Sequence, residues 1–434
     1  MTTLNINLHE LIYSLSDSLD LVGVVQIHHG KRVAFMAAEC GKAMGLNAEN
    51  LDNLYQAAIL HDCGVSNTAV HARLAQFAWE KAHGHCEIGA ALLRSTPPLA
   101  HLSEIVLHHH THWNKLKEMN IPEDIALLTN CIFMVDRVDV LSLHSQVKNA
   151  NILLGISKIR DKIAAKKGDW FKPELVDTFL NISESEAFWF SLEREHVNGY
   201  VSEWITHETT RPIKFDDVKS LVRIFSHIVD AKSRFTCEHS EGVADLSRYL
   251  GEKFELSNHS CEMLELAGLL HDIGKLRVPD DILEKPGKLS EIEFKTIQRH
   301  SFDTFSILKK IRGFDDIAQW AGQHHERVDG TGYPYHVGKK TLAIEARIIA
   351  VADVFQALAQ DRPYRAAMSP EKVLKILQSD ASEGKLDRDV VRMVENNLHE
   401  CWRVATLQDN KSNGPENRPV AKITANAELL SQAA

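Results

Sequence analysis

The sequence predicts an all-α protein made by tandem duplication of one helical domain. Apolar residues recur mostly at helical spacing, and segments typical of strands are few and short. Seven histidine and aspartate residues also appear twice, in the same order and with nearly the same gaps between them. A chain of 434 residues, 44% of them hydrophobic and 25% charged, is long enough for two buried cores.

The repeated residues are of types that bind metal ions. The first half contains His29, His61, Asp62, His85, His108, His109 and Asp136, and the second half contains His239, His271, Asp272, His300, His324, His325 and Asp353. A single buried histidine is more often a core residue than a ligand. A set repeated in fixed order instead indicates a hydrolytic two-metal site, whose ions lie roughly 3.5–4 Å apart.

The first domain is expected to span residues 1–182, with its repeat starting near Leu8. Apolar residues at helical spacing from Leu54 to Leu60 lead directly into His61-Asp62, and Gly64 can end that helix. Residues 183–217 are expected to form a linker. Its aromatic-rich part, Phe188 to Trp204, predicts one connecting helix packed on one of the domains.

The second domain is expected to span residues 218–400. Apolar positions from Cys261 to Leu270 again precede a His-Asp pair and a glycine, here Gly274. Adjacent imidazoles on a helix point about 100° apart, so His324 and His325 can share a centre only near a helix end. Residues 401–434 are expected to form a mostly disordered tail, because the chain is polar from Thr406 onward, with a weak helix at Ala425 to Gln432.

Composition excludes several classes of function. No stretch of about 18 apolar residues is present, and the first ten residues do not resemble a secretion signal, so we expect a cytoplasmic protein without a membrane segment. Seven scattered cysteines without a Cys-x-x-Cys pair argue against a disulfide framework. A net charge of −10 argues against general nucleic-acid binding. The sequence specifies no protein partner and allows a homodimer.

The second half resembles the HD-GYP family of bacterial cyclic dinucleotide phosphodiesterases, within the HD metal-hydrolase superfamily. The resemblance covers nearly all of residues 218–400. It rests on Phe235-Thr236-Cys237-Glu238-His239, His271-Asp272-Ile273-Gly274-Lys275, Lys285-Pro286-Gly287, His300, His324-His325-Glu326-Arg327, Asp329-Gly330-Thr331-Gly332-Tyr333-Pro334, Asp353 and Asp361-Arg362-Pro363-Tyr364-Arg365.

The resemblance implies how the metal ligands divide. His239, His271, Asp272 and Asp353 would hold one ion, and Asp272 would bridge to a second ion held by His300, His324 and His325. Family metals are mostly iron or manganese. Some members bind a third ion through a glutamate four residues before the first histidine. Phe235 occupies that position here, so two ions are expected.

The resemblance also implies catalytic and substrate-binding residues. Two ions can polarise a phosphodiester oxygen and lower the pKa of a bridging water. Asp272 would orient that bridge, and Lys275 would contact a phosphate or leaving oxygen. The residues expected to contact the substrate are Arg327, Asp329, Gly330, Gly332, Tyr333, Pro334, Arg362 and Arg365. Tyr333 could stack on a base.

The first half resembles an HD domain without this loop. No glycines or Tyr-Pro follow His108-His109, and Val65 replaces the lysine. The seven repeated residues favour a bound metal, with a metal-free regulatory domain as the alternative. A metal-bound first domain could remove the 5′-phosphate from the linear dinucleotide released by the second.

The substrate is left open between cyclic di-GMP, opened to 5′-pGpG, and 3′,3′-cyclic GMP-AMP, opened to 5′-pApG. An HD-like domain ahead of the HD-GYP domain resembles the arrangement in some family members that use the second compound. The alternative function is a non-catalytic receptor that binds a cyclic dinucleotide and signals through partners. Intact ligands, Lys275 and the Gly-Tyr-Pro loop argue against that receptor.

Overall fold

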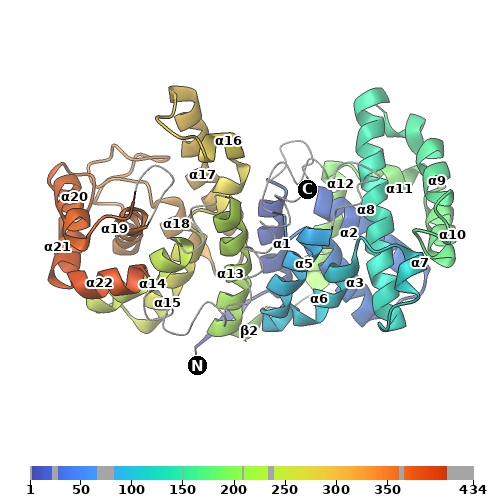
Figure 1. The fold of residues 1–434 in the computed structure, drawn as a ribbon, viewed down its shortest axis with the longest axis horizontal. Helices are drawn as coiled ribbons and strands as arrows, with labels where there is room; N and C mark the ends of the chain where they lie inside the picture. The colour runs from blue at the N-terminus through green and yellow to red at the C-terminus, as the bar shows by residue number, and fades with distance from the viewer. Residues whose placement is uncertain are drawn as a thin grey trace. The chain divides into compact units, whose positions relative to one another are not determined.

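The fold is almost entirely helical, as predicted (Figure 1). The computed structural model describes residues 2–21, 28–65, 83–149, 151–207, 210–232, 239–360 and 366–407. In these ranges the strands form one antiparallel pair, β1 (Thr3–Ile6) and β2 (Arg211–Lys214). The described residues group into two compact units, one of residues 19–207 and the other of residues 2–18 with 210–407.

The unit containing the second repeat begins with β1 and most of α1 and continues from β2. Its helical elements are α1 (Leu8–Leu19), α13 (Phe215–Lys232), α14 (His239–Lys253), α15 (Asn258–Leu270), η3 (Ile273–Arg277), α16 (Asp280–Leu283), α17 (Glu291–Leu308), α18 (Asp315–Gly322), α19 (Ile344–Ala359), α20 (Pro370–Ser382), α21 (Arg388–Asn396) and α22 (Leu398–Ala405). α14 packs against α15, α19 and α22, and α17 packs against α18 and η3.

The other unit contains the first repeat. Its helical elements are α2 (His29–Ala43), α3 (Ala48–Leu60), α5 (His83–Arg94), η1 (Pro97–Leu102), α6 (Ser103–His108), α7 (Trp113–Leu116), α8 (Glu123–Asn149), η2 (Ile152–Gly155), α9 (Ile156–Ala164), α10 (Pro173–Ile182), α11 (Glu186–Phe190) and α12 (Arg194–His207). α2 packs against α3 and α8, and α5 packs against α6.

The first two helices of each repeat match residue for residue. α2 has the same length as α14, α3 has the same length as α15, and the two pairs are offset along the chain by the same amount. α3 and α15 also have equivalent caps, because Asn47 and Ser257 each accept a hydrogen bond from the backbone N–H three residues on. Such a cap stabilises a helix by about 1 kcal/mol. The duplication therefore preserves the helix starts and the His-Asp pair that follows each helix.

The N-terminal residues belong to the unit of the second repeat, which differs from the predicted first domain of residues 1–182. Thr3 to Ile6 pair with the strand that immediately precedes α13. Arg312 donates hydrogen bonds to the Glu10 carboxylate, and Lys310 forms an ion pair with Asp17. The sequence does not indicate that the N-terminal segment packs with the second repeat, because pairing between strands so distant in the chain leaves no local pattern.

The predicted linker contains two helices, α11 and α12, where we expected one. Both pack on the unit of the first repeat, through ring contacts of Phe188 with Phe179 and of Trp204 with Tyr55. The Trp204 indole N–H also donates to Asp52 at 3.0 Å. The predicted disordered tail of residues 401–434 instead begins inside α22, where Cys401 and Ala405 are buried, and from 408 onward it lies outside the described residues. No described helix is long and apolar enough to cross a membrane.

Candidate metal centres

The second repeat brings its seven predicted ligands together around one carboxylate. Asp272 Oδ2 lies 3.3 Å from His271 Nε2 and 3.7 Å from His239 Nε2. Its other oxygen, Oδ1, lies 3.4 Å from His300 Nε2 and 3.8 Å from His324 Nε2. The two oxygens therefore face different histidine pairs, which is the geometry expected of a carboxylate that bridges two ions.

The remaining two ligands complete the two groups. Asp353 Oδ1 lies 3.3 Å from His239 Nε2, so His239, His271 and Asp353 form one cluster with ligand atoms within 4.8 Å of one another. His325 joins His300 and His324 in the second cluster. Helix ends explain this convergence. His271 directly follows α15, and His324 and His325 follow the short α18.

Hydrogen bonds orient the imidazoles. The Nδ1 atoms of His271, His300 and His324 bond the backbone carbonyl three residues earlier, at 2.6–2.7 Å. His239 Nδ1 bonds Gln356 Oε1 at 2.6 Å. Each bond fixes the tautomer that leaves Nε2 free to bind an ion, an arrangement common among metal-binding histidines.

Electrostatics also fit a cation site. Burial lowers the pKa of His300 to about 3 and that of His325 to about 4, so both are neutral ligands at pH 7. Burial alone would raise the pKa of Asp272, but the charges of His271 and Lys275 hold it well below the usual range. His271 Nε2 and Asp272 Oδ1 are buried without a hydrogen-bond partner. Because such atoms are costly to bury, their convergence fits a bound metal.

Lys275 contacts the bridge directly. Its ammonium group forms an ion pair with Asp272 Oδ2 and is partly exposed. η3, which carries Lys275, packs against α17, which carries His300. The lysine therefore lies where a phosphate bound to the ions would meet a positive charge.

A glycine allows η3 to approach α17 closely. A Cβ atom added to Gly274 would lie 2.1 Å from the carbonyl oxygen of His300, and one added to Gly64 would lie 2.0 Å from that of His85. Both distances are far below van der Waals contact. The glycine after each His-Asp pair thus lets the third histidine approach the bridging aspartate, besides following the helix end.

The Gly-Tyr-Pro loop is anchored by Glu326. This buried carboxylate accepts backbone hydrogen bonds from Tyr335, His336 and Val337 at 2.6–3.2 Å. The loop passes so close to the preceding turn that a Cβ atom on Gly332 would lie 2.4 Å from the backbone nitrogen of Arg327. These contacts hold the Tyr333 ring 4.9 Å from the ring of His325. The predicted stacking residue therefore borders the second metal cluster.

The other predicted substrate contacts have varied surroundings. Pro334 follows Tyr333 in the loop, and Gly330 adopts a positive φ of 81° that suits glycine. Asp329 Oδ1 accepts hydrogen bonds from the backbone and hydroxyl of Thr331, and the same hydroxyl accepts one from Arg327. Asp329 therefore stabilises the loop itself. Arg362 and Arg365 lie outside the described residues.

The first repeat builds a similar centre around Asp62. Its Oδ1 lies 3.4 Å from His85 Nε2 and 3.9 Å from His109 Nε2. Its Oδ2 lies 3.4 Å from His61 Nε2 and 3.7 Å from His29 Nε2. Asp136 completes a cluster with His29 and His61. Asp62 thus has the same relation to four histidines as Asp272.

In the first repeat, the pair that corresponds to His324 and His325 is His109 and His110, one residue later in the chain than predicted. His109 Nδ1 bonds the Val106 carbonyl, as His324 Nδ1 bonds that of Ala321. The rings of His109 and His110 lie 4.3 Å apart at 42°, close to the 4.0 Å and 43° of His324 and His325. His110 therefore corresponds to His325. The predicted ligand His108 lies at the end of α6, where its Nε2 is 3.7 Å from Glu104. Three successive histidines concealed this register in the sequence.

Two further differences separate the repeats. Asp139 replaces Gln356 as the partner of the first histidine, with His29 Nδ1 at 2.8 Å, and Arg32 donates two hydrogen bonds to the same carboxylate. Burial alone would lower the pKa of His29, but the hydrogen bond and charge of Asp139 raise it to about 9. Cys86 stands where the second repeat has Ser301, and it joins His85, His109 and His110 in one group.

A cavity of about 490 Å³ lies beside the second-repeat centre. It is lined by Gly274, Arg277, Val278, Glu291, Ile292, Lys295, Thr296, Arg299, His300 and Asp303. Asp303 pairs with both Arg277 and Arg299, so two of the three lining cations are already neutralised. None of the predicted substrate contacts that the structure describes lines this cavity.

We expect Gly274→Ala to lower the metal content of the second repeat. The added methyl group must push η3 away from His300, and overpacking of this kind costs about 1–3 kcal/mol. Elemental analysis and thermal unfolding of the purified variant would measure both effects. Gly64→Ala is the matched control, because it should disturb only the first repeat. Unchanged metal content in folded Gly274→Ala would contradict this role of the glycine.

Comparison with known proteins agrees with the two centres. Family models described as HD domain match residues 27–142 and 223–390. A protein of Vibrio cholerae named 3′3′-cGAMP-specific phosphodiesterase 1 is 36% identical over 408 residues, covering 93% of this chain and 95% of its own length. A cyclic di-GMP phosphodiesterase of Pseudomonas aeruginosa is 38% identical over 157 residues, covering 36% of this chain and 37% of its own.

A solved structure has a similar fold along the whole chain. The crystal structure of a cyclic GMP-AMP specific phosphodiesterase of Vibrio cholerae matches with a TM-score of 0.60 and 25% identity, covering 94% of this chain and 98% of that one. Identity and coverage of this extent show common ancestry. With two HD domains and the Gly-Tyr-Pro loop in the second, the chain belongs to the HD-GYP family of metal-dependent cyclic dinucleotide phosphodiesterases.

Proposed function

We propose that the second repeat hydrolyses 3′,3′-cyclic GMP-AMP to linear 5′-pApG. Two relatives named as specific for this compound match 93% and 70% of the chain, and a third so named matches 48%. The cyclic di-GMP phosphodiesterase of Pseudomonas aeruginosa matches 36% of it. The longer matches to proteins named for the hybrid compound support it as the substrate. Cyclic di-GMP is the second candidate, because that shorter match has slightly higher identity.

The bridging position of Asp272 is the observation that carries the proposed reaction. One oxygen faces His271 and the other faces His300, at 3.3 and 3.4 Å. Two divalent ions, iron or manganese, would be held by these clusters and would polarise the phosphodiester and activate water. His239, His324, His325 and Asp353 would supply the remaining protein ligands.

Residues around the ions would bind and orient the dinucleotide. Lys275 would move from Asp272 to a non-bridging phosphate oxygen and stabilise the charge that develops there. The Tyr333 ring borders His325 and would stack on one base. Arg327 is exposed on the same loop and would contact a second phosphate. Arg362 and Arg365 are further candidates.

The first repeat lacks the parts that would handle the cyclic substrate. Val65 occupies the position of Lys275, and the described residues after His110 lead into α7 without a glycine loop. A metal-bound first repeat would therefore act on a simpler phosphoester, such as the 5′-phosphate of the linear product. Asp62 would hold the ions in that reaction.

The substrate is tested by product analysis. Metal-loaded protein is incubated separately with 3′,3′-cyclic GMP-AMP, cyclic di-GMP and cyclic di-AMP, and the products are resolved by chromatography. The highest kcat/KM is expected for 3′,3′-cyclic GMP-AMP, with 5′-pApG as the first product. A higher kcat/KM for cyclic di-GMP would replace the substrate, and no ring opening of any compound would refute the reaction.

We expect Asp272→Ala to lose both ions of the second repeat and all ring opening. Each ion depends on this carboxylate, because removal of the bridge leaves two neighbouring cations without a shared anion. Metal analysis and initial rates would measure the effects. Asp62→Ala is the matched control and should open the ring at a near-normal rate. If folded Asp62→Ala also stops ring opening, the division between the repeats is wrong.

We expect Lys275→Met to reduce kcat by about 10²- to 10³-fold, or about 2.7–4 kcal/mol, as for removal of one preorganised donor. Its metal content should stay normal, because the ammonium group is not a metal ligand. The loss should appear mainly in kcat, since the phosphate gains charge in the transition state. A normal kcat with bound metal would show that Lys275 does not act in the reaction, and a loss of metal would make its role structural.

A further inference from the structure

The first repeat contains a thiol at a position where the second repeat has a hydroxyl. Cys86 follows His85 directly, as Ser301 follows His300 at the matching place in the second repeat. Cys86 Sγ lies 3.6 Å from His85 Nε2, and Ser301 Oγ lies 3.4 Å from His300 Nε2. The replacement is therefore confined to the donor atom. Sulfur takes the place of oxygen at the edge of one metal cluster.

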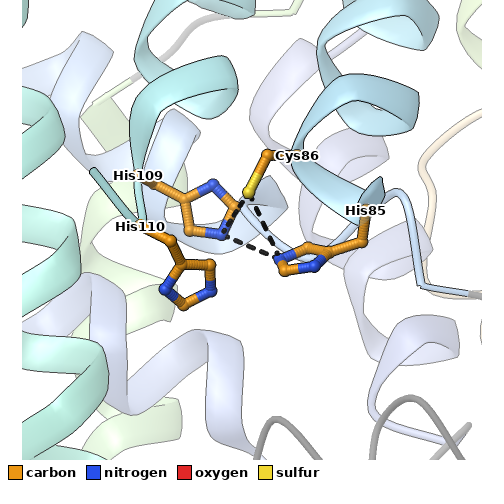
Figure 2. A group of neighbouring side chains, drawn as sticks. All are labelled: His85, Cys86, His109 and His110. Atoms are coloured by element: carbon orange, nitrogen blue, oxygen red, sulfur yellow. Dashed lines mark hydrogen bonds between the residues drawn. The ribbon is translucent and has the colours of Figure 1, made fainter. Parts of the chain in front are cut away.

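The distances fit one metal ion. Tetrahedral zinc with N and S bonds of about 2.0–2.3 Å requires N–N separations of about 3.3 Å and N–S separations of about 3.6 Å. His85 Nε2 lies 3.2 Å from His109 Nε2, and Cys86 Sγ lies 3.6 and 3.9 Å from these two atoms (Figure 2). His110 lies beside His109 and completes the group within 4.8 Å.

Burial indicates that the group is built to hold a cation. Cys86 is 1% exposed, and His85 and His109 are also buried. His110 Nε2 is buried without a hydrogen-bond partner. His109 Nδ1 donates to the Val106 carbonyl, so His109 Nε2, 3.2 Å from His85 Nε2, carries a lone pair that can bind an ion. Asp62 Oδ1, 3.4 Å from His85 Nε2, supplies a further negative charge.

From this arrangement we infer that His85, Cys86, His109 and His110 bind a zinc ion. Zinc prefers a thiolate ligand, which the second repeat does not offer at the matching position. Thiolate ligands select zinc over the harder iron and manganese ions. Four protein ligands fill the positions of a structural zinc site, so a phosphoester would bind at the other cluster of the first repeat, formed by His29, His61 and Asp136. The ion would therefore stabilise the first repeat. The inference does not depend on which dinucleotide the second repeat hydrolyses.

Cobalt binding to the metal-free full-length protein tests the thiolate directly. A Cys86–cobalt bond gives a near-ultraviolet charge-transfer band, whereas the histidine and carboxylate ligands of the second repeat do not. In the wild type, we expect this band to reach its full intensity at one bound cobalt ion per chain and to disappear when zinc is added. In Cys86→Ser, we expect no such band. Cys131→Ser is the control for loss of a buried thiol, because Cys131 Sγ instead faces the Ala37 carbonyl.

The register of the histidines gives a second matched pair. His110→Gln should weaken zinc binding at this site at least about tenfold, whereas His108→Gln should leave it unchanged. Circular dichroism would check folding of each variant. Cadmium NMR of the wild type needs no variant and should show one resonance shifted by a single sulfur ligand. Absence of that resonance and of the cobalt band, or a band that persists in Cys86→Ser, would overturn the inference.

Discussion

The bridging aspartate is the interaction on which the rest of each repeat depends. Asp272 and Asp62 are charged groups in largely buried surroundings, and a buried carboxylate is tolerated only with compensating partners. In both repeats four histidine Nε2 atoms lie within 4 Å of its two oxygens. Against the effect of burial, neighbouring carboxylates raise the pKa of His271 and of His29 to about 9, and Lys275 pairs with Asp272, so cationic groups balance the charge and bound ions would add to them. Fold, burial and metal chemistry are therefore coupled at one side chain.

The duplication preserves this framework and varies the groups around it. Helix starts, caps, the His-Asp pair and the following glycine are retained because each one sets the position of a ligand. The repeats differ at two matched positions, Lys275 against Val65 and Ser301 against Cys86, which we propose act on the substrate and on the choice of ion. Changes of this kind leave the backbone undisturbed, which explains how one fold can hold two centres of different chemistry.

The sequence predicted the helical duplication and most of the residues that converge on each aspartate, because repetition at a fixed spacing is a non-local signal that remains readable in a single chain. It failed where the signal was degenerate or distant. Three successive histidines gave two possible registers, and only the ring geometry of His109 and His110 distinguishes them. The pairing of β1 with β2 and the ion pair of Lys310 with Asp17 join segments that lie far apart in the chain, for which no local pattern exists.

The sequence also did not reveal residues that position the site without being candidate metal ligands themselves. Glu326 follows the histidine pair and looks like a surface acid, yet its buried carboxylate accepts three backbone hydrogen bonds from the substrate loop. This contact joins the loop to the metal centre. His325 is adjacent to Glu326, and its ring also contacts Tyr333 of the loop. We therefore expect substrate recognition by the loop and ion binding by His325 to be coupled through this turn.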